Sequence, residues 1–332
     1  MDKEKNDINY KRVIQALRQF TQKDIRKANW QFFITFFMLW INVLLSSYFI
    51  NNSYVLFITI PLTSVFMCRS YVIEHDCGHQ SFYHSKILNG IIGNIMGFGI
   101  LIPYSMWRFI HNSHHSHVGN LDKREFNPEI WTMTIKEYIK APGINKLAYR
   151  FMRSKFTRLL IVPTINFGIV FRLIHPKFNV ESIISVILHN TIYVLIFIQL
   201  NSLISFSNLF LIYFLPLIIF YCIASFTFYA QHQFENTYWE EKENWSYTEA
   251  VFNGASCIKA PFLYRWLTGN VLYHNVHHIQ SSIPNYNLHE AEKKLSSIMS
   301  YKYHRITEVW HFLNLKLWDE KKKRLVSFRN IS

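Results

Sequence analysis

The longest uncharged segment of the chain decides what it can fold into. From Ala28 to Cys68 there is no Asp, Glu, Lys, Arg or His over 41 residues. A single helix of this length would be roughly 60 Å long, whereas the hydrocarbon core of a bilayer is about 30 Å thick. The segment is therefore predicted to fold back on itself at the polar triplet Asn51-Asn52-Ser53. This gives two membrane spans, at about 30–50 and 54–73.

A second uncharged run has the same form. No Asp, Glu, Lys or Arg occurs over the 50 residues from Ser182 to Gln231, and a polar stretch interrupts the run at about 201–208. The pattern predicts a second hairpin, with spans at about 183–200 and 209–230.

Two shorter apolar stretches are marginal for crossing a membrane. They are Ile87 to Tyr104, which contains four glycines, and Leu159 to Phe171. We interpret both as re-entrant or interfacial.

The first 29 residues differ from the spans that follow. They carry eight Lys or Arg, and their apolar side chains recur at helical spacing at Val13, Ile14, Leu17 and Phe20. This pattern predicts an N-terminal amphipathic segment over 1–29. No internal repeat, low-complexity tract or flexible linker divides the chain, so 1–332 is predicted to be one domain.

The positive charges indicate how the chain is oriented. Both predicted turns lack charge, whereas the segments before, between and after the hairpins carry the Lys and Arg residues. By the positive-inside rule, the two termini and the region from about 74 to 181 face the cytoplasm, so we expect a multi-pass protein of the cell membrane. The net charge of +14 is spread over membrane-flanking segments without a nucleic-acid-binding motif, which argues against a nucleic-acid partner.

Histidines form three dense clusters in this sequence. The clusters are His75-Asp-Cys-Gly-His79, His111-Asn-Ser-His114-His115 and His274-Asn-Val-His277-His278. With 16 histidines in 332 residues, a His-x-x-His-His pattern should arise by chance only roughly 0.04 times, and here it occurs twice. On a helix such spacing places two or three imidazoles on one face. Eight imidazoles exceed what one first-row ion holds, so two metal ions are implied.

Their position relative to the spans places the clusters on one side of the membrane. The first cluster follows the first hairpin, and the third lies beyond the second hairpin. The second cluster shares their side only if 87–104 dips into the membrane and returns. The predicted fold is therefore all-α: about four transmembrane helices in two hairpins, with a cytoplasmic helical cap that carries the metal site.

Three strings around these clusters resemble the histidine boxes of the membrane fatty acid desaturases, most of all the bacterial acyl-lipid branch. They are Glu74-His-Asp-Cys-Gly-His-Gln-Ser-Phe82, Trp107-Arg-Phe-Ile-His-Asn-Ser-His-His115 and Thr268-Gly-Asn-Val-Leu-Tyr-His-Asn-Val-His-His278. Two further strings are also similar to that branch, Asn120-Leu-Asp-Lys-Arg124 and Gln231-His-Gln-Phe-Glu-Asn-Thr-Tyr-Trp239. The resemblance extends from about Glu74 to Leu288.

The resemblance implies a non-haem di-iron centre with O2 as co-substrate, held by the eight box histidines and a ninth at the position of His232. The expected metal ligands are thus His75, His79, His111, His114, His115, His232, His274, His277 and His278. Three neighbouring carboxylates are candidates for orienting the imidazoles, or are solvated loop charges: Asp76, Asp122 and Glu235. Nitrogen ligation suits iron, while zinc and copper also fit these residue types.

The activity expected from the resemblance is oxygen-dependent formation of a cis double bond in fatty acyl chains, most simply those of membrane lipids. The sequence contains neither a dinucleotide-binding fingerprint nor a fused haem-binding module, so a separate electron donor such as ferredoxin is expected. A hydroxylase or other oxygenase of the same superfamily is the alternative outcome. A membrane metal transporter or sensor is a third hypothesis, although a transporter would place its ligands near the middle of the bilayer.

Overall fold

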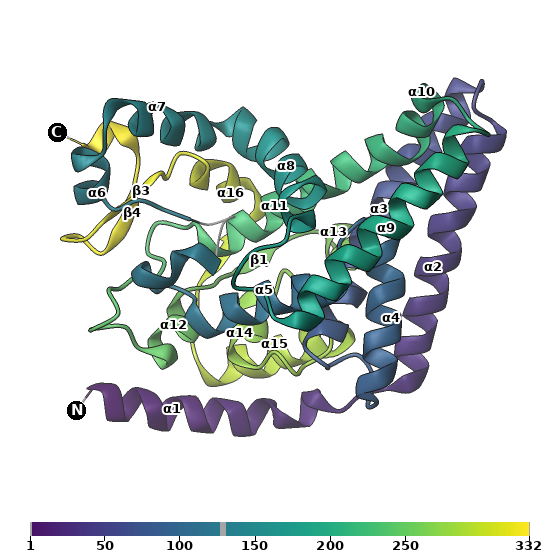
Figure 1. Ribbon diagram of the computed structural model, residues 1–332. Helices are drawn as coiled ribbons and strands as arrows, with labels where there is room; N and C mark the ends of the chain where they lie inside the picture. Colours follow the sequence, from purple (N-terminus) through teal and green to yellow (C-terminus); the bar gives the residue numbers. More distant parts are fainter. Residues whose placement is uncertain (1, 127–130, 332) are drawn as a thin grey trace.

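The computed structural model describes residues 2–126 and 131–331 (Figure 1). Within these residues, four helices are long and apolar enough to cross a membrane, which confirms the two predicted hairpins. They are α2 (Ile25–Tyr48), α3 (Ser53–Gly78), α9 (Val180–Asn201) and the run Phe206–His232, composed of α10 (Phe206–Leu209), η5 (Phe210–Phe214) and α11 (Leu215–His232). Most of these helices begin a few residues before the predicted bounds, because side chains cap their amino ends. The capping residues are Asp24, Asn52, Asn179 and Ser205.

The spanning helices bury one face and expose the other. α3 packs against α2 and α11, and Phe66 and Phe220 lie in their shared core. The opposite faces are apolar and open: Phe57 of α3 is 83% exposed, and Leu195 of α9 is 61% exposed. Continuous apolar surface of this kind is unfavourable in water and suits contact with lipid chains.

The first short apolar stretch, at 87–104, folds back on itself, as predicted. Helix α4 (Lys86–Phe98) packs against α3, and a tight turn then leads into α5 (Tyr104–His117). The close approach of α5 requires a glycine in α4, since a Cβ atom at Gly93 would lie 2.3 Å from the ring of Tyr104. The chain therefore brings the second histidine cluster back beside the first.

Three tyrosine hydroxyl groups hold this turn in place. Tyr193 of α9 donates to the carbonyl of Phe98 at 3.0 Å. Tyr213 and Tyr221, from the second hairpin, donate to the next two carbonyls, of Gly99 at 3.1 Å and of Ile100 at 3.0 Å. These bonds satisfy backbone carbonyls at the turn.

The second short apolar stretch is broken into short helices. It comprises η3 (Thr157–Ile161), α8 (Val162–Gly168) and η4 (Val170–Arg172). Together with α7 (Gly143–Met152) it forms a pair bent by 67°, a geometry found in broken spans and re-entrant loops.

A helical cap covers one end of the four spanning helices. It includes the helices α1 (Asp2–Leu17), α12 (Tyr247–Asn253), α14 (His274–Ile279), α15 (Leu288–Ile298) and α16 (Ile306–Phe312). The amphipathic segment predicted at the amino end is α1, which lies along the edge of the cap in Figure 1. Its Val13 and Leu17 are buried against Ile279, Leu288 and Leu295, so its apolar stripe faces protein.

Shorter elements complete the described chain. The helical ones are η1 (Arg18–Thr21), η2 (Leu121–Phe126), α6 (Ile135–Lys140), α13 (Phe262–Leu267), η6 (Asn285–Asn287) and η7 (Phe328–Asn330). Two pairs of three-residue strands join the cap: β1 (Cys257–Lys259) runs parallel to β2 (Tyr303–Arg305), and β3 (Leu317–Asp319) runs antiparallel to β4 (Arg324–Val326). The helical fold class is confirmed, with these short strands as additions.

Candidate metal centre

The nine histidines expected as ligands gather in two groups where α3, α5 and α11 meet α14 of the cap. Within each group, one ligand atom from every residue lies within 4.8 Å of the others. The first group contains His75, His79, His111, His115 and His277, and the second contains His114, His232, His274 and His278. The sequence predicted one shared site for two ions, and the structure supplies two sets of nitrogen atoms.

Helix geometry explains how the histidines divide between the groups. His111 and His115 lie four residues apart on α5 and belong to the first group, whereas His114 of the same helix points to the second. On α14 the pair four residues apart, His274 and His278, belongs to the second group. Side chains at i and i+4 share a face, and the intervening one points elsewhere. The i, i+4 spacing is the sequence signal that separates the two groups.

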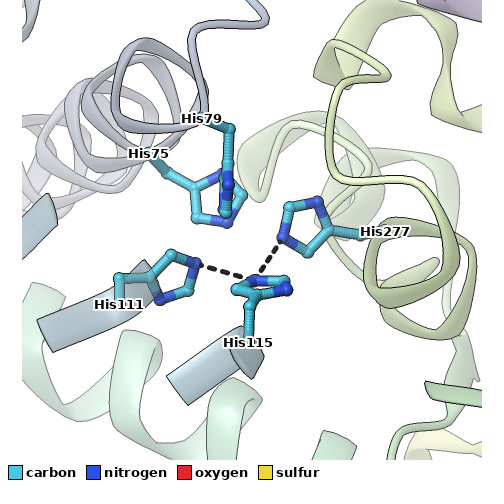
Figure 2. A group of neighbouring side chains, drawn as sticks. All are labelled: His75, His79, His111, His115 and His277. Atoms are coloured by element: carbon cyan, nitrogen blue, oxygen red, sulfur yellow. Dashed lines mark hydrogen bonds between the residues drawn. The ribbon is translucent and has the colours of Figure 1, made fainter. Parts of the chain in front are cut away.

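Figure 2 shows the first group as a ring of imidazoles that point toward one another from α3, α5 and α14. The Nε2 atom of His115 lies 3.1 Å from Nε2 of His111 and 3.0 Å from Nε2 of His277 (dashed in Figure 2). The buried Nε2 atoms of His75 and His79 have no hydrogen-bond partner in the described part of the chain. These inward-facing nitrogen atoms are therefore available to bind a non-protein ligand.

The second group is built around His274. Its Nε2 atom lies 2.9 Å from Nε2 of His232 and 3.1 Å from Nε2 of His278, and the latter lies 3.4 Å from Nε2 of His114. The Nδ1 atom of His232 lies 2.8 Å from the carbonyl of Gly254. That contact places the ring proton on Nδ1 and leaves the Nε2 lone pair free to ligate.

These spacings fit metal ions. Two nitrogen ligands at right angles on an ion with bonds of about 2.0–2.1 Å lie roughly 3 Å apart, which matches the closest Nε2 pairs. The imidazoles are also neutral, as metal binding requires. Burial holds the pKa of His79, His111 and His115 well below its usual value, and neighbouring imidazoles lower this pKa further. The pKa values of His274, His277 and His278 are lowered by the same causes. Neutral imidazole is the form that binds metals.

One of the three candidate carboxylates lies at the site. Asp76 is buried, and its Oδ1 atom lies 3.1 Å from Nδ1 of His75. Its Oδ2 atom accepts hydrogen bonds from the backbone and side-chain amides of Asn285, at 2.6 and 2.8 Å. Asp76 therefore orients the His75 ring and ties α3 to the cap.

The other two carboxylates have different partners. Asp122 accepts a hydrogen bond from the backbone amide of Lys242 at 2.8 Å. Glu235 forms an exposed ion pair with Arg324 at 3.0 Å. The sequence predicted these two residues near the site because each lies close to a histidine string in the chain. In the structure, their side chains point to the surface of the cap.

We expect Asp76→Ala to lower the affinity for metal about 10–100-fold, because the His75 ring loses the group that orients it. Asp122→Ala is the matched control, and it should retain the wild-type affinity. Titration with a chelator, followed by measurement of the metal that stays on the protein, compares the three forms. Equal retention by the two variants would contradict the role assigned to Asp76.

A small apolar pocket of about 40 Å³ lies between the two groups and the spanning helices. Its walls come from α3 and α11 and include Cys68, Tyr71, Val72, Phe220, Ala224 and Thr227. The pocket reaches His75 and His111 of the first group and His274 of the second. Sequence analysis missed these wall residues, because they are ordinary side chains of hydrophobic helices and carry no pattern of their own.

Comparison with known proteins gives a consistent result. The family model described as "Fatty acid desaturase" matches residues 51–310. The chain is 34% identical over 325 residues to "Fatty acid desaturase" of Bacillus subtilis (strain 168), which covers 97% of this chain and 91% of that protein. It is 27% identical over 257 residues to "sn-1 acyl-lipid omega-3 desaturase (ferredoxin)" of Nostoc sp. (strain 36), covering 73% and 68% of the two chains. It is also 25% identical over 256 residues to "sn-1 oleoyl-lipid 12-desaturase" of Anabaena variabilis, covering 74% and 70%.

Proposed function

This chain belongs to the fatty acid desaturase family, and from that premise we propose that it uses O2 to introduce a double bond into acyl chains of membrane lipids at a di-iron centre. Its nine clustered histidines are the proposed ligands, five for one iron ion and four for the other. The observation that carries the proposal is the pair of histidine groups, with a small apolar pocket that adjoins both of them. A short segment of an acyl chain in this pocket would lie beside both metal positions.

The protein's part in the reaction is to position the chain and exclude water. When bound, reduced iron with O2 supplies an oxidant able to remove hydrogens from a methylene group, which no side-chain acid or base can do. The pocket walls from α3 and α11 are apolar and would exclude water from the reacting part of the chain. Trp107 stacks on the His111 ring, with the ring centroids 4.5 Å apart. This contact fixes one wall of the site, and Asp76 fixes another through His75.

Electrons come from a separate acidic carrier in this proposal. The similar protein of Nostoc is named for ferredoxin, and this chain has 35 Lys and Arg against 21 Asp and Glu. Opposite charge speeds the encounter of redox partners. We further propose that the protein lies in the cell membrane with its termini and metal site on the cytoplasmic side, as the positive-inside rule indicates.

Expression in a host that lacks unsaturated products tests this function. With ferredoxin and O2 present, the host lipids should gain acyl chains that have lost two hydrogens, identified by gas chromatography and mass spectrometry. Chains that gain an oxygen atom instead would show the hydroxylase outcome. Unchanged lipids, with the protein present in the membrane and its iron bound, would contradict the proposal.

A further inference from the structure

Helix α7 lies where the spanning helix α11 reaches the cap. Just after α7, the guanidinium group of Arg153 lies 5.4 Å from the ring of Tyr229, which is three residues before the end of α11. Further along the chain, Phe167 of α8 stacks on the ring of Tyr221, with the ring centroids 5.1 Å apart. Tyr221 lies eight residues before Tyr229 in α11, which is roughly 12 Å along the helix axis. The chain therefore runs from the cap end of α11, at α7, to membrane depth, at α8.

Buried contacts anchor α7 to the rest of the protein. Arg153 donates from Nη2 to Oε1 of Gln233 at 3.0 Å and to the carbonyl of Leu315 at 3.1 Å. Tyr149 of α7 donates from its hydroxyl group to the carbonyl of Lys316 at 2.5 Å. These bonds fix one side of α7 against protein and leave the opposite side free.

The free side of α7 is apolar. Ile144, Leu147 and Phe151 are spaced i, i+3 and i+7, and they are 71%, 65% and 58% exposed. This spacing places the three side chains on one stripe of the helix. Exposed apolar side chains continue along the chain at Phe156 and, in α8, at Ile165. The apolar surface thus extends from membrane depth onto α7.

Positive charge accompanies this apolar surface. Residues 135–161, which comprise α6, α7 and η3 and which we call the basic arm, contain seven Lys or Arg and one Glu. The carboxylate of that residue, Glu137, forms an ion pair with Arg124 at 2.5 Å. Exposed cations of the arm include Lys140, Arg150 and Lys155. The arm therefore carries a large share of the chain's net charge of +14.

An apolar stripe with cations beside it fits the surface of an anionic bilayer. A helix of this kind lies in the interface, with its apolar side chains among the acyl chains and its Lys and Arg at the headgroups. Each Lys or Arg at an anionic surface strengthens binding about fivefold. An acidic protein would match the charges but would leave the apolar stripe without a partner of its own kind.

We infer that the basic arm docks on the bilayer surface at the cap end of the spanning helices and gathers anionic phospholipids there. These lipids are docking partners, distinct from the acyl chain that reacts. The inference goes beyond the proposed function, and its test needs no turnover.

The test identifies the lipid beside α7 by fluorescence quenching. The full-length protein is reconstituted in vesicles with equal amounts of phosphatidylcholine and phosphatidylglycerol, and one of the two lipids carries brominated acyl chains. A fluorescent label on Leu147→Cys reports the neighbouring lipid, because bromine quenches only at short range. Labelling of the protein with its four native cysteines alone gives the background.

Two other label positions serve as references. Leu195→Cys lies on the lipid-facing side of α9, and Ser297→Cys lies on α15, at the edge of the cap opposite to α7 (Figure 1). The label at Leu147 should show a preference for phosphatidylglycerol of at least about fivefold, the effect of one cation. The label at Leu195 should be quenched equally by the two lipids, and the label at Ser297 by neither.

Charge variants assign this preference to the basic arm. The triple variant Lys140→Gln, Arg150→Gln and Lys155→Gln should lose the preference, while the Leu147 label stays quenched through the remaining apolar stripe. Lys155→Gln alone should lower the preference several-fold; the Lys155 ammonium group lies 5.6 Å from the Trp310 ring, so its loss leaves the backbone contacts of α7 intact.

A matched control removes the same charges from another part of the cap. It combines three substitutions of exposed residues on α1 and α15: Lys11→Gln, Arg12→Gln and Lys294→Gln. This variant should keep the wild-type preference at the Leu147 label.

Three results would overturn the inference: no quenching at Leu147 by either lipid, equal quenching by both in the wild-type protein, or an unchanged preference in the arm's triple variant. Added ferredoxin should leave the quenching at Leu147 as it was. Loss of quenching on its addition would identify a protein-docking surface and would also overturn the inference. A protein that shows the lipid preference but forms no unsaturated chains would contradict the proposed function and leave the docking of the arm supported.

Discussion

Replacing His277 or His114 with alanine should abolish desaturation, with a loss of more than about 100-fold, and reduce the bound iron from two ions per chain to one or none. The two residues belong to different groups, His277 to the first and His114 to the second. Loss of a direct ligand is expected to exceed the 10–100-fold effect of losing a group that orients one. Acyl-chain analysis of expressing cells measures the activity, and elemental analysis of the purified protein measures the iron.

His304→Ala is the control for these two variants. His304 belongs to neither group; it packs against the rings of Phe234 and Phe312 and lies 3.6 Å from Glu308. The His304→Ala variant should retain both iron ions and most of the activity. If His277→Ala kept two iron ions and wild-type activity, the assignment of the first group as a metal site would be wrong.

Closing the apolar pocket should produce the second large loss. Ala224 lines the pocket on α11, and Ala224→Trp would fill the apolar space beside the metal positions. We expect activity on long acyl chains to fall more than about tenfold, because overpacking blocks the productive position. Iron content should stay at the wild-type level, since the substitution changes no ligand. Acyl-chain analysis and elemental analysis on the same preparation give both quantities.

A second tryptophan substitution serves as the control. Val194 lies on α9 with 57% of its surface exposed, and it faces away from the pocket. Val194→Trp should therefore leave activity unchanged. Equal activity of Ala224→Trp and Val194→Trp would show that the acyl chain follows another path.

The spanning helices were predictable from sequence because the bilayer limits their length. An uncharged run of 41 residues is too long for one crossing, and Asn52 marks the break, where it caps α3. The re-entrant interpretation of 87–104 followed from the same constraint, since the second histidine cluster had to return to the first. The resemblance to the membrane fatty acid desaturases is also confirmed.

The details of the site could not be predicted from the sequence, because they depend on tertiary contacts. Asp76, Asp122 and Glu235 were equivalent in sequence, but only Asp76 lies beside an imidazole in the structure. Its position depends on Asn285, more than 200 residues away in the chain. The apolar pocket was not predictable, because its residues resemble those of any membrane-facing helix.

If nine histidines hold two iron ions, the metal content of the protein must show it. Elemental analysis of the purified full-length protein, combined with X-ray absorption at the iron edge, gives the number of ions and the type of ligand. The account predicts two iron ions per chain in an environment dominated by nitrogen ligands. A single zinc ion per chain, in protein that desaturates acyl chains, would contradict it.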